Sequence, residues 1–385
     1  MTASQHMVHA NGLRFRTMVD GPAGGELFIL LHGFPEGAES WSKQVEALSR
    51  AGCLTVAPDL RGYGLSDAPD GVEHYAITHL VEDVAGIIKA FGRAAAHVAG
   101  HDWGAVVAWF FAGRHPEMTK TLTALSVAHP AALAASSRED EDQQTRSRYV
   151  ALFLMEGKAE RVLADEDHRR LRAMFASGPK PDAVPRGVID HFTRSLGRPG
   201  RLTAALNYYR ANLRTEGGAW EALAGLGAIQ APTQLLWGDQ DPALGRRAIE
   251  ATAARVQGEF RLEILAGAGH WLQFERPDEV NRALTRAASK LSGMLHRDEQ
   301  ERRQGLRRLD DILDTLEQLN LHDRTELPDH VAEALVLLGI TAPHSIPVPQ
   351  LIERVWAMQQ PYLITIVVER RRRRRRKVSS ESALV

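Results

Sequence analysis

Apolar runs of strand length occur in the first 130 residues and again after residue 230. The earlier runs span 27–31, 53–57, 95–99 and 121–127, and the later ones span 233–237 and 260–265. Runs without polar alternation predict strands that are buried on both faces of a parallel sheet. Helical patterns accompany them at 81–91, 105–114 and 280–291. This alternation predicts an α/β fold whose strands are joined by right-handed crossovers.

The segment 131–230 has a different pattern, because strand-like runs disappear from it and helical spacing takes over. Turn signals interrupt it at 178–181 (Gly-Pro-Lys-Pro) and 198–200 (Arg-Pro-Gly). We interpret 131–230 as a helical lid inserted between two parts of one sheet domain, 1–130 and 231–291. Such an insertion would cover the carboxyl edge of the sheet.

Residues 292–385 are interpreted separately. Leucines at helical spacing predict a small, mainly helical extension of unknown role over 292–369; they are Leu306, Leu309, Leu313, Leu316 and Leu319. The tail 370–385 begins with eight consecutive basic residues, which fit either a solvated, disordered tail or an anionic partner such as nucleic acid or a membrane surface. The run lacks interleaved aromatic residues, so no specific nucleic-acid recognition is expected.

Composition and charge are those of an ordinary globular protein. The net charge is −1, with 44% hydrophobic and 25% charged residues, which is ordinary for a globular protein and gives no reason to expect a polyanionic partner. Cys53 is the only cysteine, so an intramolecular disulfide is impossible and a reducing compartment is expected. The chain begins without a signal-peptide pattern and contains no apolar run of about 18 residues. We therefore expect a cytoplasmic protein with no transmembrane segment.

The chemistry centres on Gly-His-Asp-Trp-Gly at 100–104, between a predicted strand and a predicted helix. This is the setting of a nucleophile elbow, a strained turn whose middle side chain is presented to a substrate. Here the middle residue is Asp102. A carboxylate suits displacement at a tetrahedral carbon, which yields an alkyl ester of the enzyme. The simpler interpretation is that Asp102 caps the following helix.

A two-step hydrolysis also needs oxyanion donors, a base and an acid that orients the base, and the sequence offers candidates for each. His-Gly-Phe-Pro at 32–35 ends the first strong strand run, so the backbone N–H groups of Phe34 and Trp103 are candidate oxyanion donors. His270 lies in a small-residue loop and is a candidate base for activating water. Asp239 and Asp241 both follow the strand at 233–237, and either could orient that base. The alternatives for these positions are an ordinary turn, a structural histidine and solvated loop carboxylates.

With these motifs in hand, the chain resembles the epoxide hydrolase branch of the α/β-hydrolase fold over residues 7–291. The resemblance rests on five segments in order: 32–36, 59–66, 100–104, 238–241 and 269–270. It implies that Asp102 is the nucleophile, His270 the base and Asp241, rather than Asp239, the orienting acid.

The same resemblance implies two lid tyrosines that hydrogen-bond the epoxide oxygen. Tyr149 and Tyr209 match these positions, whereas Tyr208 is interpreted as structural. Haloalkane and haloacid dehalogenases share the aspartate nucleophile, and Trp103 could serve a halide site in such an enzyme. The segment 32–36 and the tyrosine pair resemble epoxide hydrolases more closely.

The expected function is therefore hydrolysis of an epoxide to a vicinal diol. The substrate is expected to be a small apolar molecule, and neither a cofactor nor a metal is expected. The alternatives are a dehalogenase that uses Asp102 and a non-catalytic binding protein that keeps the pocket. The sequence is also compatible with a homo-oligomer.

Overall fold

The computed structural model describes residues 3–213, 223–288, 347 and 349–351. The chain divides into two units, 1–289 and 290–385. The extension 292–369 and the basic tail 370–385 lie outside the described residues, apart from residues 347 and 349–351. The fold below is that of the first unit.

The described residues form a mixed, mostly parallel sheet of eight strands in the order β1-β2-β4-β3-β5-β6-β7-β8. The strands are β1 (Ser4–Ala10), β2 (Leu13–Asp20), β3 (Leu27–Leu31), β4 (Leu54–Pro58), β5 (Ala96–His101), β6 (Thr119–Leu125), β7 (Thr233–Gly238) and β8 (Phe260–Leu265). Strands β3 to β8 pair in parallel, and only the β1–β2 and β2–β4 pairings are antiparallel. All six predicted runs form strands, which confirms the predicted α/β-hydrolase fold.

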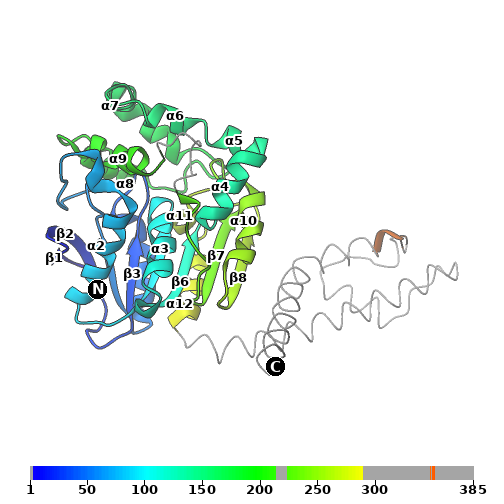
Figure 1. Cartoon of the computed structure of the whole chain (residues 1–385), viewed down its shortest axis with the longest axis horizontal. Coiled ribbons are helices and arrows are strands. Elements are labelled where there is room, and N and C mark those ends of the chain that lie inside the picture. The colour runs from blue at the N-terminus through cyan, green and yellow to red at the C-terminus, as the bar shows by residue number, and fades with distance from the viewer. Residues whose placement is uncertain (1–2, 214–222, 289–346, 348, 352–385) are drawn as a thin grey trace, which may run out of the picture. The chain divides into compact units, whose positions relative to one another are not determined.

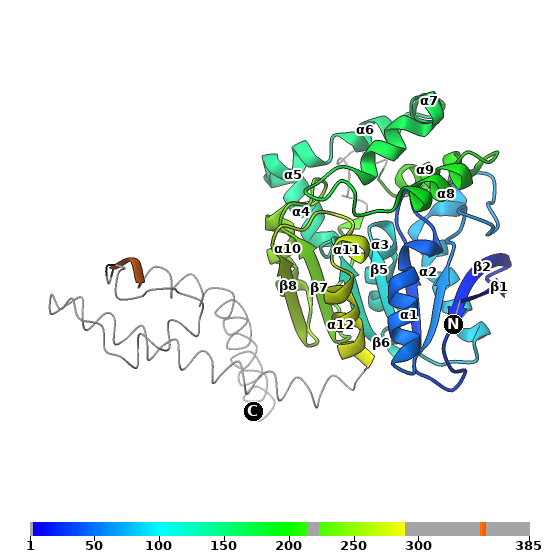
Figure 2. The same ribbon diagram turned by 180° about the vertical axis from the view of Figure 1, so that it is seen from behind.

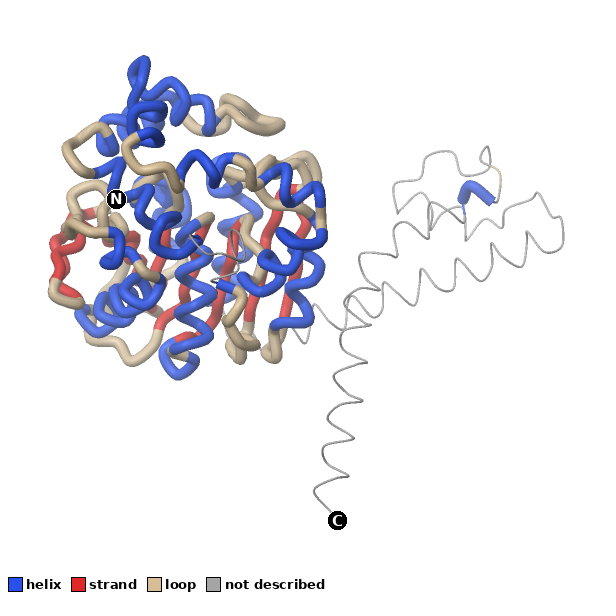
Figure 3. Tube along the Cα trace, turned by 45° about the horizontal axis from the view of Figure 1, so that its top comes forward, coloured by secondary structure: helices blue, strands red, loops and turns tan. Residues whose placement is uncertain are grey.

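Helices cover both faces of this sheet. The helices packed on it are α1 (Ser42–Arg50), α2 (Ile77–Ala90), α3 (Trp103–Arg114), α10 (Arg246–Ala251) and α12 (Pro277–Ala288). Figure 1 shows α2, α3 and α10 on one face, and Figure 2 shows α1 and α12 on the other. In Figure 3 the red strands accordingly lie between blue helices. This double cover explains why the central strands have buried side chains throughout.

Helix α3 lies at the centre of the core. Its residues from Trp103 to Ala112 are all buried, so no polar face separates it from its surroundings. A helix that is apolar all round is stable only when neighbours cover every side. Strand β5, which precedes it, and helix α2 supply part of that cover. The turn between β5 and α3 is consequently anchored from both ends.

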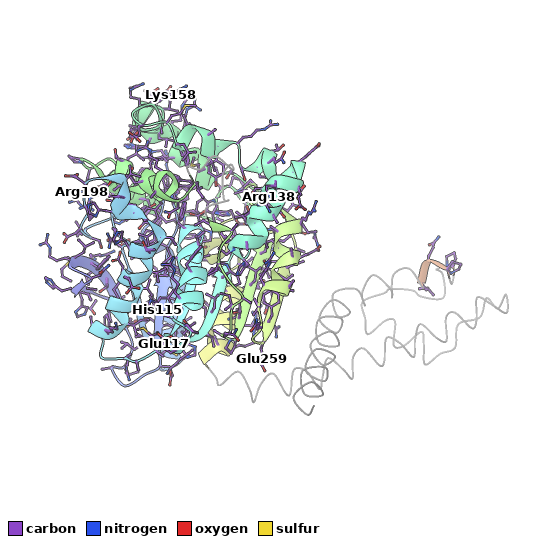
Figure 4. All side chains as sticks on the ribbon, in the orientation of Figure 1. His115, Glu117, Arg138, Lys158, Arg198 and Glu259 are labelled. Atoms are coloured by element: carbon purple, nitrogen blue, oxygen red, sulfur yellow. The ribbon has the colours of Figure 1, made fainter. Side chains whose placement is uncertain are left out.

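A helical cap follows β6, as the segment 131–230 predicts. Its described helices are α4 (Pro130–Glu139), α5 (Glu141–Arg146), α6 (Tyr149–Phe153), α7 (Lys158–Phe175), α8 (Arg186–Leu196) and α9 (Arg201–Leu213). Figure 4 labels Lys158, Arg138 and Arg198 around this cap, and His115, Glu117 and Glu259 at the opposite end of the first unit. The cap lies beyond the carboxyl ends of the parallel strands (Figure 1). Loops after these strands therefore face the cap.

The sequence analysis missed the β1–β2 hairpin. β1 is an edge strand, and most of its side chains are exposed, so it carries no continuous apolar run. Its register with β2 pairs Ser4 with Val19 and Ala10 with Leu13. Edge strands need only one partner, which leaves little hydrophobic signal in the sequence.

Candidate active site

Asp102 occupies a tight turn between β5 and α3, with φ 50° and ψ −122°. Few non-glycine residues adopt a positive φ, and those that do often mark functional sites. The neighbouring glycines make the turn possible. A Cβ on Gly100 would lie 2.1 Å from the carbonyl oxygen of Gly104, and one on Gly104 would lie 2.0 Å from that of Leu31. The sequence Gly-x-Asp-x-Gly thus packs the elbow directly against β3.

The carboxylate of Asp102 does not cap α3, although the residue occupies the N-cap position. Instead its Oδ1 accepts a hydrogen bond of 2.8 Å from the backbone N–H of Phe34. The loop after β3 can approach Asp102 this closely because residue 33 is glycine. A Cβ on Gly33 would lie only 2.3 Å from the Cβ of Asp102. The peptide bond between Phe34 and Pro35 is cis. One of the two predicted oxyanion donors therefore already contacts the carboxylate.

His270 faces two carboxylates. Its Nδ1 lies 2.8 Å from Oδ2 of Asp241, and its Nε2 lies 3.8 Å from Oδ2 of Asp102. Asp241 is fully buried, and its Oδ1 accepts hydrogen bonds from the backbone N–H groups of Ala243 and Leu244. These contacts fix the orientation of the acid, which in turn holds the imidazole ring.

Asp239, the second candidate acid, has a different partner. Its Oδ1 accepts a hydrogen bond of 2.8 Å from the backbone N–H of Gly267. It therefore contacts the start of the loop that carries His270 and not the imidazole ring. Geometry favours Asp241 as the partner of His270, as the resemblance implied.

Electrostatics couple the three charged side chains. Burial opposes the charged form of His270, but Asp241 and then Asp102 outweigh it and raise the pKa of His270 well above its usual value. Burial likewise opposes ionisation of Asp102, but His270, His101 and the Phe34 N–H lower its pKa. The resting site thus favours a carboxylate next to an imidazolium.

The two predicted lid tyrosines meet beside the elbow. The Tyr209 ring packs edge-on against the rings of both Tyr149 and Trp103. The rings of Tyr149 and Tyr209 lie 6.3 Å apart, and that of Tyr209 lies 5.1 Å from Trp103. Burial, with a contribution from the negative charge of Asp102, raises the pKa of both tyrosines. Both therefore remain protonated donors.

Tyr208 points elsewhere, although it is adjacent to Tyr209 in the chain. Its hydroxyl donates a hydrogen bond of 2.8 Å to the carbonyl oxygen of Arg61, and the side chain is fully buried. This contact ties α9 of the cap to the loop after β4, in agreement with a structural role for Tyr208.

The sequence analysis missed a buried polar network behind the site. Oε2 of Glu36 lies 3.0 Å from the backbone nitrogen of Gly33 and 2.9 Å from Nδ1 of His101. The His101 Nε2 and the Ser126 hydroxyl lie 2.8 Å and 2.9 Å from the carbonyl oxygen of His270. Glu36 and His101 both lie in motifs that we singled out, but only the fold brings these distant segments together.

The described residues contain no group of three or more His, Cys, Asp or Glu side chains placed to hold a metal ion. Within the same part of the chain, no helix is both long enough and apolar enough to cross a membrane.

The fold and this site define the class of protein. Residues 26–277 match the family model for the alpha/beta hydrolase fold, and the chain belongs to that family. Within it, the chain is epoxide hydrolase-like. It is 35% identical to epoxide hydrolase A of Mycobacterium tuberculosis over 317 residues, which cover 73% of this chain and 96% of the relative.

The solved structures that the chain resembles are also epoxide hydrolases. Epoxide hydrolase A of Mycobacterium thermoresistibile matches with a TM-score of 0.64 and 34% identity, covering 75% of this chain and 99% of that one. An F128A mutant of the Bacillus megaterium epoxide hydrolase, crystallised with its product (R)-3-[1]naphthyloxy-propane-1,2-diol, matches with a TM-score of 0.67 and 30% identity. The match covers 74% of this chain and all of that protein.

Proposed function

We propose that this protein hydrolyses epoxides to vicinal diols through a covalent ester of Asp102. The observation that carries the proposal is the position of His270, whose two ring nitrogens face Asp102 and Asp241. This arrangement supports a role for His270 as the base that activates water next to the carboxyl group of Asp102. The epoxide hydrolases among its relatives support the choice of substrate class.

In the first step, Oδ2 of Asp102 attacks an epoxide carbon and the carbon–oxygen bond of the ring breaks. The leaving oxygen takes a proton from the paired hydroxyls of Tyr149 and Tyr209. Donors placed where negative charge develops stabilise such a transition state. Oδ1 remains hydrogen-bonded to the Phe34 N–H and becomes the carbonyl oxygen of the ester.

In the second step, His270 removes a proton from water, and the resulting hydroxide attacks the ester carbon of Asp102. The tetrahedral oxyanion is stabilised by the backbone N–H groups of Phe34 and Trp103. Esterification removes the charge of Asp102, which lowers the pKa of His270, so that the imidazolium passes its proton to the tyrosinate left by ring opening and becomes the neutral base before it acts on water. Collapse of the tetrahedral intermediate breaks the ester bond, and the expelled alkoxide takes the remaining proton of the attacking water. This releases the diol and restores the Asp102 carboxylate beside the protonated His270.

A dehalogenase that uses Asp102 is the main alternative. It would need donors that hold a halide ion, and Trp103 is the candidate. The rings of Tyr149 and Tyr209 lie 6.3 Å apart, and the Tyr209 ring packs against Trp103, which favours an oxygen-stabilising tyrosine pair instead. The intact set of Asp102, Asp241 and His270 argues against a purely binding role.

The test compares turnover of styrene oxide, an aryl glycidyl ether and a bromoalkane by the wild-type protein and an Asp102→Ala control. We expect diol from the epoxides, no bromide release, and no turnover by the control. In a His270→Gln variant the alkyl-enzyme should accumulate, detected as a mass increase on the peptide that contains Asp102. Turnover of epoxide without that adduct would falsify the two-step scheme.

A further inference from the structure

The loop that carries His270 is hydrogen-bonded to the carboxylate of Glu275, which has no role in the proposed mechanism. Glu275 lies in the short helix α11 (Leu272–Glu275), and only 6% of it is exposed. Its Oε2 accepts a hydrogen bond of 2.6 Å from the backbone N–H of Gly269, and its Oε1 accepts one of 3.0 Å from that of Trp271. One side chain thus holds the residues on both sides of His270.

Other contacts restrain the same stretch of backbone. The carbonyl oxygen of His270 faces the His101 imidazole and the Ser126 hydroxyl. A Cβ on Gly269 would lie 2.9 Å from Oε1 of Glu275, so the carboxylate approaches this closely only because residue 269 is glycine. The peptide groups around the base are therefore held through N–H groups on one side and a carbonyl on the other.

The cap reaches this loop as well. The indole N–H of Trp271 donates a hydrogen bond of 3.2 Å to the carbonyl oxygen of Met174, and its ring lies 4.7 Å from that of Phe175. Lys180 donates a hydrogen bond of 3.1 Å to the carbonyl oxygen of Glu275. The loop that carries His270 is therefore also in contact with the cap.

We propose that Glu275 is a positioning residue that sets the place of His270 for ester hydrolysis. The inference rests on the proposed function and names a residue that acts through the base without touching substrate. Hydrogen bonds between a carboxylate and backbone N–H groups are stronger than neutral ones. A glutamine would offer one acceptor oxygen and one NH₂ group, so one of the two N–H groups would lose its partner.

This role predicts a defect in one step only. Attack by Asp102 on the epoxide does not require proton uptake by His270, whereas hydrolysis of the ester does. A small displacement of a catalytic group, on the order of 1 Å, can slow its step roughly 100-fold. A purely structural role would instead weaken folding or slow both steps together.

The test uses the full chain carrying Glu275→Gln, with Glu279→Gln as a matched control in the first turn of α12. Single-turnover reactions with styrene oxide are quenched in acid, and intact mass follows the ester. In Glu275→Gln we expect ester formation within about 3-fold of wild type, hydrolysis slowed roughly 10- to 100-fold, and accumulated ester. Glu279→Gln should resemble wild type in both steps.

The second readout needs no substrate. NMR titration of the His270 ring should give a lower pKa in Glu275→Gln than in wild type, because the ring is less well held against its carboxylates. If Glu275→Gln does not fold, Glu275→Asp, which keeps the charge but has a shorter reach, takes its place in both measurements.

Unchanged hydrolysis and an unchanged titration in a folded variant would overturn the proposal, as would equal slowing of both steps. Failure of the wild-type protein to form any ester would count against the proposed function alone. The titration would then decide the role of Glu275 by itself.

Discussion

At the scale of single residues, the site consists of three ionisable side chains, held in a buried place, that affect one another's charge. His270 lies between Asp102 and Asp241, and each carboxylate raises the pKa of the imidazole against the opposing effect of burial. In the proposed mechanism, esterification of Asp102 removes one of these charges. The same side chain can therefore rest as an imidazolium and act later as a base.

Replacing Asp102 with asparagine imitates that loss of charge without changing the shape of the side chain. We expect the pKa of His270 in Asp102→Asn to fall below its wild-type value, because only Asp241 still favours the charged ring. NMR titration of the ring, assigned by comparison with His270→Gln, measures this. A titration curve that stays in place would show that Asp102 and His270 are not coupled.

Removal of one tyrosine hydroxyl should slow ring opening while leaving the fold intact. We expect Tyr209→Phe and Tyr149→Phe each to lower kcat/KM for an epoxide by roughly 100-fold, the usual effect of losing one oxyanion donor. Tyr208→Phe is the matched control, since its hydroxyl bonds to Arg61 and not to the pair. It should lower stability and spare kcat/KM; equal activity losses in all three variants would contradict the assignment.

At the scale of elements, helix α9 fastens the cap to the sheet domain. Asn212 near its end donates hydrogen bonds to the carbonyl oxygens of Tyr75 and Tyr208 and accepts one of 2.7 Å from the backbone N–H of Ile77. The last contact satisfies the first turn of α2, whose N–H groups have no partner within the helix. A single cap residue thus serves three backbone groups.

Asn212→Ala should lower the free energy of unfolding by about 3 kcal/mol, because buried backbone groups lose their partners. Urea unfolding of the variant and of wild type measures the difference. Gln144→Ala, on the exposed side of α5, should change stability by less than about 0.5 kcal/mol. Comparable losses in the two variants would mean that Asn212 is not a special connection.

The elements also differ in how well the sequence predicts them. Apolar runs identified β3 to β7 because both faces of these strands are buried. The edge strand β8 is only half-buried and alternates apolar with charged residues, but its apolar positions still marked it as a strand. The exposed edge strand β1 lacks that signal. Loops after β5, β7 and β8 gave Asp102, Asp241 and His270, since parallel strands bring their carboxyl ends to one edge. Glu36 and Glu275 escaped prediction because their importance lies in backbone groups that only the folded chain brings near them.

At the scale of the whole molecule, two buried histidines make the fold sensitive to acid. Burial lowers the pKa of both His97 and His129 to about 4. His97 stacks on Phe28, and His129 accepts a hydrogen bond at the start of α4. Both rings are therefore neutral in the native protein at neutral pH.

Unfolding returns each ring to a pKa near 6.5, so the unfolded chain binds more protons between pH 6.5 and pH 4, and native stability falls as the pH falls through this window. By pH 5 the loss should be about 2 kcal/mol per histidine. Urea unfolding at pH 7.5 and pH 5.0 measures it. In His97→Gln the difference in stability between the two pH values should shrink by about that amount, and Phe28, on which the ring stacks, is left in place.

The glycines of the elbow have a practical consequence for anyone who wishes to change what this enzyme accepts. A Cβ at position 33, 100 or 104 would collide with the Asp102 side chain or with backbone. Libraries randomised at these three positions should yield almost no active clones, even when many clones are screened. Diversity is better placed in the cap, away from the turn that holds Asp102.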